Sequence, residues 1–294
     1  MSKNIIAVVT PVYNGEKTIG SSINSLLSQT FNDWVSIIVN DGSTDNTKDV
    51  LKKYLHDDRF IIINLEENKG RPFARNIALE KVKDINAKYM CMLDADDLYY
   101  PNKLEWQYDY MEKNPDLTLM SCSLGYINEN YQLIGVLDSY SEEKIYHFKD
   151  FVKYKGVPHA SSIIRAKDIE DTKFDLKMTL GEDQDFMNRL LINRKYAFIP
   201  KIGYLYNRVD SFSIKKYKKS LKLGIYSSKK QGYKSATIFK LIIINQFKLL
   251  YMRILFLIGK ENIYFKKIGR TPTKSELIYH NSILTIKPLN TPHS

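Results

Sequence analysis

Tyr89–Tyr100 reads YMCMLDADDLYY, and this stretch decides the fold because an apolar run ends in three closely spaced carboxylates, Asp94, Asp96 and Asp97. The run predicts a buried strand over Tyr89–Leu93. Side chains alternate along a strand, so Asp94 and Asp96 are expected to point the same way just beyond its end. Mg²⁺ and Mn²⁺ are commonly held by one or two carboxylates together with phosphate oxygens and water. Alone, the motif also fits a solvated loop or a helix cap, so its interpretation depends on the residues upstream.

Residues 5–93 alternate between strand-like and helix-like patterns, which predicts a parallel sheet with helices on both faces. Gly42 and Gly70 are expected in turns, and Ser43 or Thr44 as the cap of the following helix. Pro72 suits the first turn of a third helix. The expected strands are Ile5–Tyr13, Val35–Asn40, Phe60–Asn64 and Tyr89–Leu93, and the first two helices cover Ile19–Leu27 and Asp45–Leu55.

Polar clusters follow the carboxyl ends of these strands. In open α/β sheets, ligands bind in the crevice outside those ends. We therefore expect Pro11–Asn14, Asp41, Gly70–Arg75 and Asp94–Asp97 to face one crevice.

Five short motifs occur in a fixed order, and together they are more specific than any one of them. In order and spacing they resemble glycosyltransferase family 2 over roughly residues 4–210, and most of all the bacterial enzymes that build O-antigen, capsule or other surface polysaccharide. The resemblance implies a GT-A fold and an inverting transfer from a nucleotide sugar. The motifs are TPVYN (Thr10–Asn14), DGSTD (Asp41–Asp45), NKGRPFARN (Asn68–Asn76), DADD (Asp94–Asp97) and GED (Gly181–Asp183).

The resemblance assigns the nucleotide site to the first motifs. Thr10, Pro11 and Tyr13 are expected along the nucleoside. Asp41 is expected to accept a hydrogen bond from the base, most simply the N3–H of uracil, and UDP is therefore favoured over GDP or TDP, although thymine offers the same donor. The alternative for Asp41 is a turn aspartate beside Gly42.

The same resemblance assigns the phosphate and metal contacts. Arg71 and Arg75 are expected to contact the nucleotide or to order the loop against Asp94, the alternative being an arginine buried for packing. Asp94 is expected to reach the ribose or share the metal, and Asp96 to bind the Mn²⁺ or Mg²⁺ that bridges the two phosphates. Asp97 is either a second ligand or a helix cap.

Inverting transfer needs a carboxylate that deprotonates the acceptor hydroxyl, a cation for the departing diphosphate, and exclusion of water. We expect Asp183 to be the base, with Glu182 as the fallback, because both match the family's Glu-Asp motif at the start of a helix. Acidic residues also stabilise a helix N-terminus through its dipole, and Asp185 fits that role better. Arg208 is expected to close over the diphosphate, although Val209 and Asp210 follow where the family often has a histidine.

The acceptor-binding part, between Asp97 and Gly181, carries a weaker signal. Leu117–Ile127 and Tyr131–Val136 predict a hairpin, Phe148–Tyr154 a helix, and residues 156–165 a strand. His159 lies near the entrance of that strand, where it either touches acceptor or phosphate or is structural.

The positive charge of the chain lies in its tail. Residues 215–294 hold 17 of the 44 Lys and Arg residues and 2 of the 33 Asp and Glu residues. The apolar stretch Ile238–Ile258 is interrupted by Lys240, Lys248 and Arg253, so we expect an interfacial helix or helical hairpin on an anionic membrane rather than a membrane-spanning helix. The alternative is a helix packed on the catalytic domain with a solvated basic face. Nucleic-acid binding lacks any accompanying motif.

Together these features predict an α/β catalytic domain over residues 1–214 and a basic, helical, membrane-associating tail over residues 215–294. The expected acceptor is a polyprenyl-diphosphate-linked saccharide. No signal peptide is expected, and Cys91 and Cys122 lie in apolar runs typical of buried thiols in a reducing cytoplasm. Two other classes are a nucleotidyltransferase, whose glycine-rich phosphate loop is missing, and a membrane-bound scaffold without activity. A dinucleotide-dependent oxidoreductase is disfavoured because no G-x-G-x-x-G follows the first strand.

Overall fold

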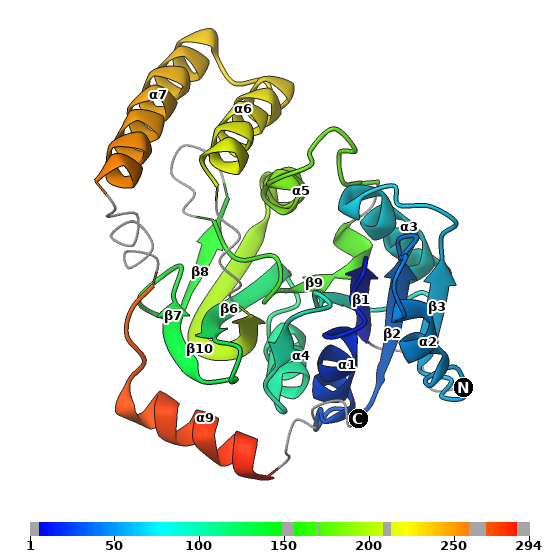
Figure 1. Ribbon diagram of the computed structural model, residues 1–294. Coiled ribbons are helices and arrows are strands. Elements are labelled where there is room, and N and C mark those ends of the chain that lie inside the picture. The colour runs from blue at the N-terminus through cyan, green and yellow to red at the C-terminus, as the bar shows by residue number, and fades with distance from the viewer. Residues whose placement is uncertain (1–5, 149–155, 170, 208–212, 259–268, 287–294) are drawn as a thin grey trace.

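The computed structural model describes residues 6–148, 156–169, 171–207, 213–258 and 269–286. Within them a mixed ten-stranded sheet forms the centre, in the order β3-β2-β1-β4-β9-β6-β10-β5, with β7 beside β6 and β8 beside β10 (Figure 1). The strands are β1 Ile6–Val12, β2 Trp34–Asn40, β3 Phe60–Asn64, β4 Tyr89–Met92, β5 Leu98–Tyr99, β6 Leu117–Ile127, β7 Leu133–Leu137, β8 Lys144–His147, β9 Ile163–Arg165 and β10 Lys195–Asn207. The helices are α1 Ile19–Leu27, α2 Thr47–Lys52, α3 Arg71–Asp84, α4 Lys103–Lys113, α5 Glu182–Leu191, α6 Ile214–Lys230, α7 Ser235–Leu257 and α9 Lys274–Ile286, with a 3-10 turn, η2, at Ala166–Asp168.

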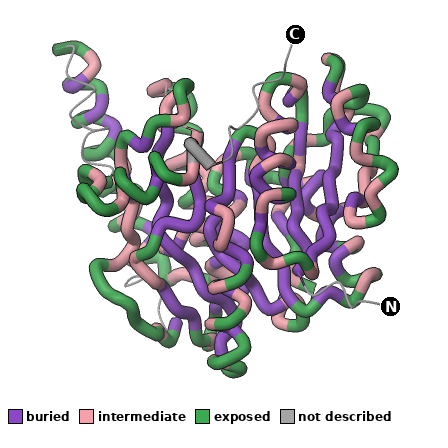
Figure 2. Tube along the Cα trace, turned by 90° about the horizontal axis from the view of Figure 1, so that it is seen from below, coloured by how far each residue is buried: buried purple, intermediate pink, exposed green. Residues whose placement is uncertain are grey.

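The predicted parallel sheet is confirmed for β1 to β4, which pair in parallel. Its apolar strands are buried on both faces because helices cover both. Along β1, Ala7 and Val9 face the core under α3 and α5, whereas Ile6 and Val8 face the core under α1, α2 and α4. Figure 2 shows these strands as buried segments between partly exposed helices. The carboxyl ends of the parallel strands therefore form one edge, where the site lies.

Three details of the predicted elements are corrected. The second helix starts at Thr47 rather than Asp45, because the Asp45 carboxylate accepts the backbone N–H of Thr47 at 3.0 Å. Ser43 and Thr44 do not cap it and bond to Asn14 instead. The strand predicted over residues 156–165 begins only at Ile163, because the chain turns before it.

The predicted hairpin is confirmed as β6 and β7, which pair antiparallel. The helix predicted over Phe148–Tyr154 lies outside the described residues from position 149 onward. Cys91 and Cys122 are both buried free thiols.

The predicted tail has two parts. Helices α6 and α7 pack against each other away from the sheet (Figure 1). Helix α9 instead packs on the catalytic domain, where His280 Nδ1 lies 2.9 Å from the Tyr100 hydroxyl and Nε2 lies 2.7 Å from the Tyr131 carbonyl. No helix in the described part of the chain is both long and apolar enough to cross a membrane.

Candidate active site

Two loops at the sheet edge are tied together by backbone and side-chain hydrogen bonds. Asn14, which follows β1, adopts a left-handed conformation with φ 52°, accepts the backbone N–H of Thr44 at 2.8 Å and donates its own to Ser43 Oγ at 2.9 Å. The backbone N–H of Gly15 donates to Thr47 Oγ1 at 2.8 Å. These bonds hold the loop after β1 against the loop after β2.

Asp41 is a buried carboxylate that fixes a third loop. Its two oxygens accept the backbone N–H groups of Lys69 and Gly70 at 2.8 and 2.9 Å. Such charge-assisted bonds are stronger than neutral ones. The neighbouring Gly42 has φ +64°, and a Cβ there would lie 2.3 Å from the backbone of Glu67, so the turn requires glycine. Asp41 thus has a structural role as a loop anchor, and its carboxylate also faces the cavity described next.

A cavity of about 430 Å³ opens at this edge, and four of the predicted nucleotide-site residues line it: Pro11, Tyr13, Asp41 and Arg71. Thr10 lies buried in β1 next to this edge. The predicted contact Arg208 lies outside the described residues. The first three motifs therefore contribute to one cavity, whereas Arg75, Asp94, Asp96 and Asp183 do not line it.

A network of ion pairs lies beside this cavity. Arg75 is buried, and its guanidinium contacts Glu182 at 3.0 Å and Asp94 at 3.2 Å. Arg71 is half exposed and reaches the same Glu182 oxygen at 2.9 Å. The buried Glu182 carboxylate therefore holds two arginines, one of which orders Asp94. Of the two roles expected for the arginines, the contact of Arg75 with Asp94 corresponds to loop ordering, and both arginines use Oε1 of Glu182.

The acidic turn separates its three carboxylates into different environments. β4 ends at Met92, and the backbone N–H of Asp97 bonds to the Asp94 carbonyl at 3.1 Å, so a turn rather than strand alternation sets their directions. Burial, and then the charge of Asp94, raise the pKa of the Asp96 carboxyl, although its side chain still reaches solvent. Asp97 is fully buried and accepts hydrogen bonds from the Tyr204 hydroxyl at 2.7 Å and the Asn207 backbone N–H at 2.8 Å. In the described contacts both Asp97 oxygens thus bond to the end of β10.

Asp94 and Asp96 fit a divalent cation that is shared with a diphosphate. Burial and the charge of Asp94 both disfavour the ionised form of Asp96, and a cation between the two carboxylates offsets both effects. In the described residues no three His, Cys, Asp or Glu side chains gather to hold a metal alone. Mg²⁺ in phosphate-transfer and related sites usually takes one or two carboxylates and completes its shell with phosphate oxygens and water.

Asp183 faces a second cavity, of about 480 Å³, lined also by Gly156, Pro158, His159 and Gln184. It is half-buried at the N-terminus of α5, next to Glu182. His159 is buried and packs edge-on against the stacked rings of Phe174 and Phe186, and burial followed by the charge of Arg75 lowers its pKa to about 3. The imidazole is therefore neutral and has a packing role in the wall of this cavity.

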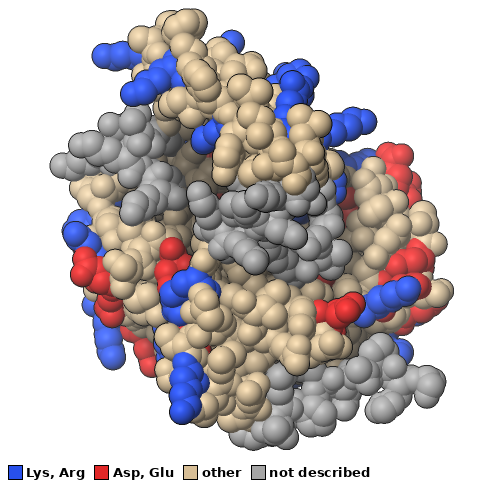
Figure 3. All heavy atoms as spheres, turned by 60° about the vertical axis from the view of Figure 1, so that its left-hand side comes forward, with Lys and Arg blue, Asp and Glu red and all other residues tan. Residues whose placement is uncertain are grey.

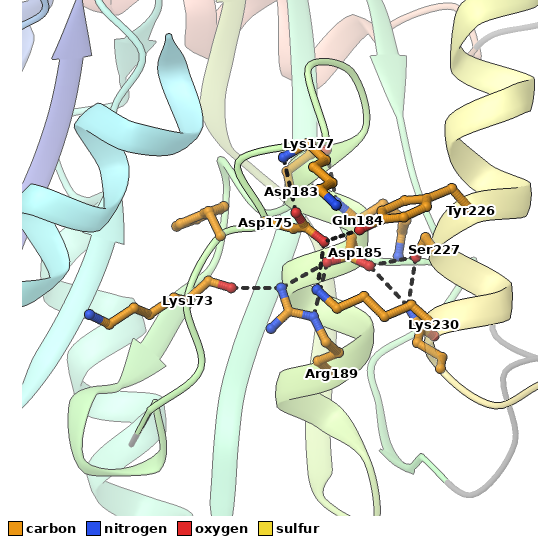
Figure 4. A network of polar contacts seen from close by, with 12 residues as sticks. Lys173, Asp175, Lys177, Asp183, Gln184, Asp185, Arg189, Tyr226, Ser227 and Lys230 are labelled. Atoms are coloured by element: carbon orange, nitrogen blue, oxygen red, sulfur yellow. Dashed lines mark hydrogen bonds and ion pairs between the residues drawn. The ribbon is translucent and has the colours of Figure 1, made fainter. Parts of the chain in front are cut away.

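Asp185 has the structural role that its position suggested. It is buried, pairs with Arg189 on the same helix at 2.7 Å, and accepts hydrogen bonds from Ser227 and Gln231. Figure 4 shows Asp185 facing α6, with Asp175 beside it. Asp175 pairs with Lys230 of α6. The helix that carries Asp183 is thereby fastened to the basic helix α6.

Two tyrosines of β10 were missed by the sequence reasoning, which singled out only Arg208 in this segment. Tyr204 bridges the acidic turn, since its hydroxyl donates to Asp97 and accepts the Asp94 backbone N–H at 3.1 Å. Tyr206 stands nearby, and burial followed by the charge of Asp97 raises its pKa to about 12. Their alternation in YLYN, with both side chains on one face, was the available signal.

Comparison with known proteins gives one family. The model of Glycosyl transferase family 2 matches residues 7–171. A glycosyltransferase of Methanocaldococcus jannaschii, described as uncharacterized, is 33% identical over 222 residues, which cover 73% of this chain and 71% of the relative. The Escherichia coli enzyme WfgD, a UDP-Glc:alpha-D-GlcNAc-diphosphoundecaprenol beta-1,3-glucosyltransferase, is 34% identical over 135 residues, which cover 46% of this chain and 49% of that enzyme.

Solved structures show the same fold. S. aureus TarS 1-349 in complex with UDP-GlcNAc aligns with a TM-score of 0.63 at 20% identity, covering 81% of this chain and 70% of that one. A mannosyltransferase of Pyrobaculum calidifontis in complex with GDP-Man and Mn²⁺ aligns with a TM-score of 0.57 at 14% identity, covering 97% and 81%. The GT-A fold is thus shown, and with the family model spanning more than half of its residues, this chain belongs to glycosyl transferase family 2 and is a glycosyltransferase.

Proposed function

We propose that this chain transfers a hexose or N-acetylhexosamine from a UDP-sugar to a hydroxyl of a lipid-linked saccharide during surface polysaccharide synthesis, of the O-antigen or capsule type. The observation that supports this most is that the adjacent residues Glu182 and Asp183 lie at different cavities. Glu182 holds the arginines beside the cavity lined by Asp41, whereas Asp183 lines the other cavity. A donor site and an acceptor site then meet at the start of α5.

The first cavity suits a uridine nucleotide. The Asp41 carboxylate has lone pairs beyond the two backbone N–H groups that it accepts, so it can also accept the N3–H of uracil. Tyr13 exposes 49% of its surface at the cavity wall, where an aromatic ring can lie along the nucleoside. The relatives give support: WfgD is named for UDP-Glc, and TarS has been solved with UDP-GlcNAc.

The second cavity suits the attacking hydroxyl. In the proposed single displacement, Asp183 takes the proton of the acceptor hydroxyl as its oxygen attacks the anomeric carbon from the face opposite the diphosphate, which inverts the configuration. Asp94 and Asp96 would hold Mn²⁺ or Mg²⁺, which when bound neutralises charge on the leaving diphosphate. Arg71 is half exposed at the donor cavity and adds positive charge there.

The hairpin of α6 and α7 supports the proposed acceptor class, domain division and location. Residues 214–257 contain eleven Lys and Arg residues and no Asp or Glu. Phe239, Phe247 and Leu257 expose 65%, 68% and 85% of their surface on α7. Apolar side chains beside an excess of positive charge favour binding in the interface of an anionic membrane. We therefore propose a peripheral enzyme at the cytoplasmic face of the cell membrane, with residues 1–214 catalytic and the tail from 215 as its membrane-associating part.

The test is a thermal-shift titration with UDP, GDP, TDP and CMP, each with and without Mn²⁺. A nucleotide at 100 times its dissociation constant stabilises the native state by about 2.7 kcal/mol. For a chain of this size that corresponds to a rise in Tm of roughly 5–10 °C. We expect UDP to raise Tm and the rise to depend on Mn²⁺. Asp96→Asn should lose this rise, whereas Asp109→Asn, at an exposed aspartate on α4, should keep it. No shift with any nucleotide would favour an inactive scaffold.

A further inference from the structure

Helices α6 and α7 enclose a groove that the transfer reaction does not use. The two helices pack side by side, and a cavity of about 370 Å³ lies between them. Its lining combines two kinds of side chain. Lys218, Lys222 and Arg253 are cationic, and Asn245 and Gln246 add amide donors.

Among the described residues, no acidic side chain pairs with these three cations. Lys230 of α6, by contrast, pairs with Asp175 at 2.5 Å. Figure 3 shows Lys and Arg side chains, without Asp or Glu, on the visible surface of the helical pair at the top of the view. Three cations held around one groove repel each other, and an anion with more than one negative charge relieves that repulsion.

The remaining wall of the groove is apolar. Leu221 and Ile225 of α6 face Ile242 and Leu249 of α7 across it. A free inorganic anion gains nothing from such a wall, but a hydrocarbon chain removes it from water. The occupant that matches both walls is a molecule with a phosphate at one end and an apolar chain at the other.

We propose that this groove is a discrete binding site for a membrane lipid whose head is a terminal phosphate or diphosphate. A phosphate monoester carries about −1.5 to −2 charges at neutral pH, more than the single charge of a diester lipid, and so matches three cations better. The site rests on the proposed membrane association of the hairpin and adds selectivity for the head group. Diffuse attraction to an anionic surface depends only on total charge. The groove would instead distinguish lipids by how much charge one head group carries.

The test compares full-length protein binding to two kinds of phosphatidylcholine vesicle, one containing phosphatidic acid and one containing phosphatidylglycerol, matched in zeta potential and measured by co-sedimentation. We expect about tenfold tighter binding to the phosphatidic acid vesicles, an energy difference within reach of two or three charge-assisted hydrogen bonds. The triple variant Lys218→Gln, Lys222→Gln, Arg253→Gln should lose this preference.

The matched control removes the same charge from the same hairpin outside the groove. Lys229, Lys234 and Lys240 are exposed and do not line it. Their triple Gln variant should bind both vesicles more weakly and keep the tenfold preference. Because all six positions are exposed, both variants should keep the wild-type Tm, which is measured alongside.

Four outcomes would overturn the proposal. Equal affinity of the wild type for both vesicles would leave only diffuse attraction, and an equal loss of preference in both triple variants would remove the groove from the explanation. Inorganic pyrophosphate titrated without vesicles tests a soluble anion; binding as tight as that of phosphatidic acid vesicles would assign the groove to free phosphate. Absence of binding to either vesicle would overturn the membrane association as well, whereas the UDP titration would be unaffected.

Discussion

Glu182→Gln and Asp183→Asn form a pair of substitutions that separates stability from catalysis at two adjacent residues. The Glu182 side chain is 3% exposed and its Oε1 contacts Arg71 and Arg75 at 2.9 and 3.0 Å. Asp183 is half-buried, lines the second cavity, and accepts only the backbone N–H of Gln184, at 2.8 Å, in the described contacts. The first change removes a buried charge that two arginines contact. The second removes a charge that faces a cavity.

The magnitudes differ accordingly. Breaking a buried ion pair typically costs 3–5 kcal/mol, and the lower value of about 3 kcal/mol applies because Arg75 keeps its contact with Asp94. The pair with the half-exposed Arg71 adds at most about 1 kcal/mol. Glu182→Gln should therefore lower Tm by roughly 5–7 °C, since the unfolding entropy grows with chain length. Asp183→Asn should change stability by no more than about 0.5 kcal/mol, yet reduce turnover about 10²–10⁴-fold because the general base is lost.

Two measurements on the same samples check this. Differential scanning fluorimetry gives Tm, and UDP release in the presence of a GlcNAc-diphosphate-lipid acceptor gives turnover, with UDP binding as the control for an intact donor site. Asp183→Asn should bind UDP like the wild type. Wild-type turnover in Asp183→Asn would refute its role as the base. An inactive Glu182→Gln variant with unchanged Tm would transfer that role to Glu182.

Three further predictions use other parts of the structure. Asp41→Asn should weaken UDP binding about 10–100-fold and lower the free energy of unfolding by about 1–3 kcal/mol, because the amide nitrogen cannot accept the second backbone N–H group. Calorimetric UDP titration and thermal unfolding measure the two effects, and unchanged UDP binding would contradict the assignment. The pKa of Asp96 is raised in the folded state, so its ionised carboxylate destabilises the fold. This destabilisation sets in as the pH rises above the pKa of the carboxyl in the unfolded chain. Metal-free Asp96→Asn should therefore be at least as stable as the wild type at pH 7 and lose its Mn²⁺-dependent rise in Tm, and a variant less stable without metal would contradict this reasoning. The double variant Phe239→Ser, Phe247→Ser should reduce vesicle co-sedimentation by at least about tenfold without lowering Tm, since both rings are exposed. As a control, Leu55→Ser changes an exposed apolar residue on the catalytic domain and should leave vesicle binding unchanged.

The sequence was sufficient to predict the parallel half of the sheet and the edge at which the motifs meet. β1 to β4 are short apolar runs ended by polar turns, which is the pattern expected of strands covered on both faces. Because parallel strands end at the same edge, the motifs containing Asp41, Arg75 and Asp94 had to meet there, and they do. Local pattern was sufficient because each of these positions is fixed by its own strand and turn.

The surroundings of each carboxylate, by contrast, depend on the tertiary structure. In DADD, Asp96 reaches solvent while Asp97 is taken by Tyr204, a residue 107 positions away. In GED, Glu182 is committed to Arg75, also 107 positions away, which leaves Asp183 to face a cavity. Neighbouring aspartates and glutamates have nearly the same intrinsic chemistry, so sequence cannot rank them. Their burial, partners and pKa values depend on long-range packing, and only the folded chain supplies it.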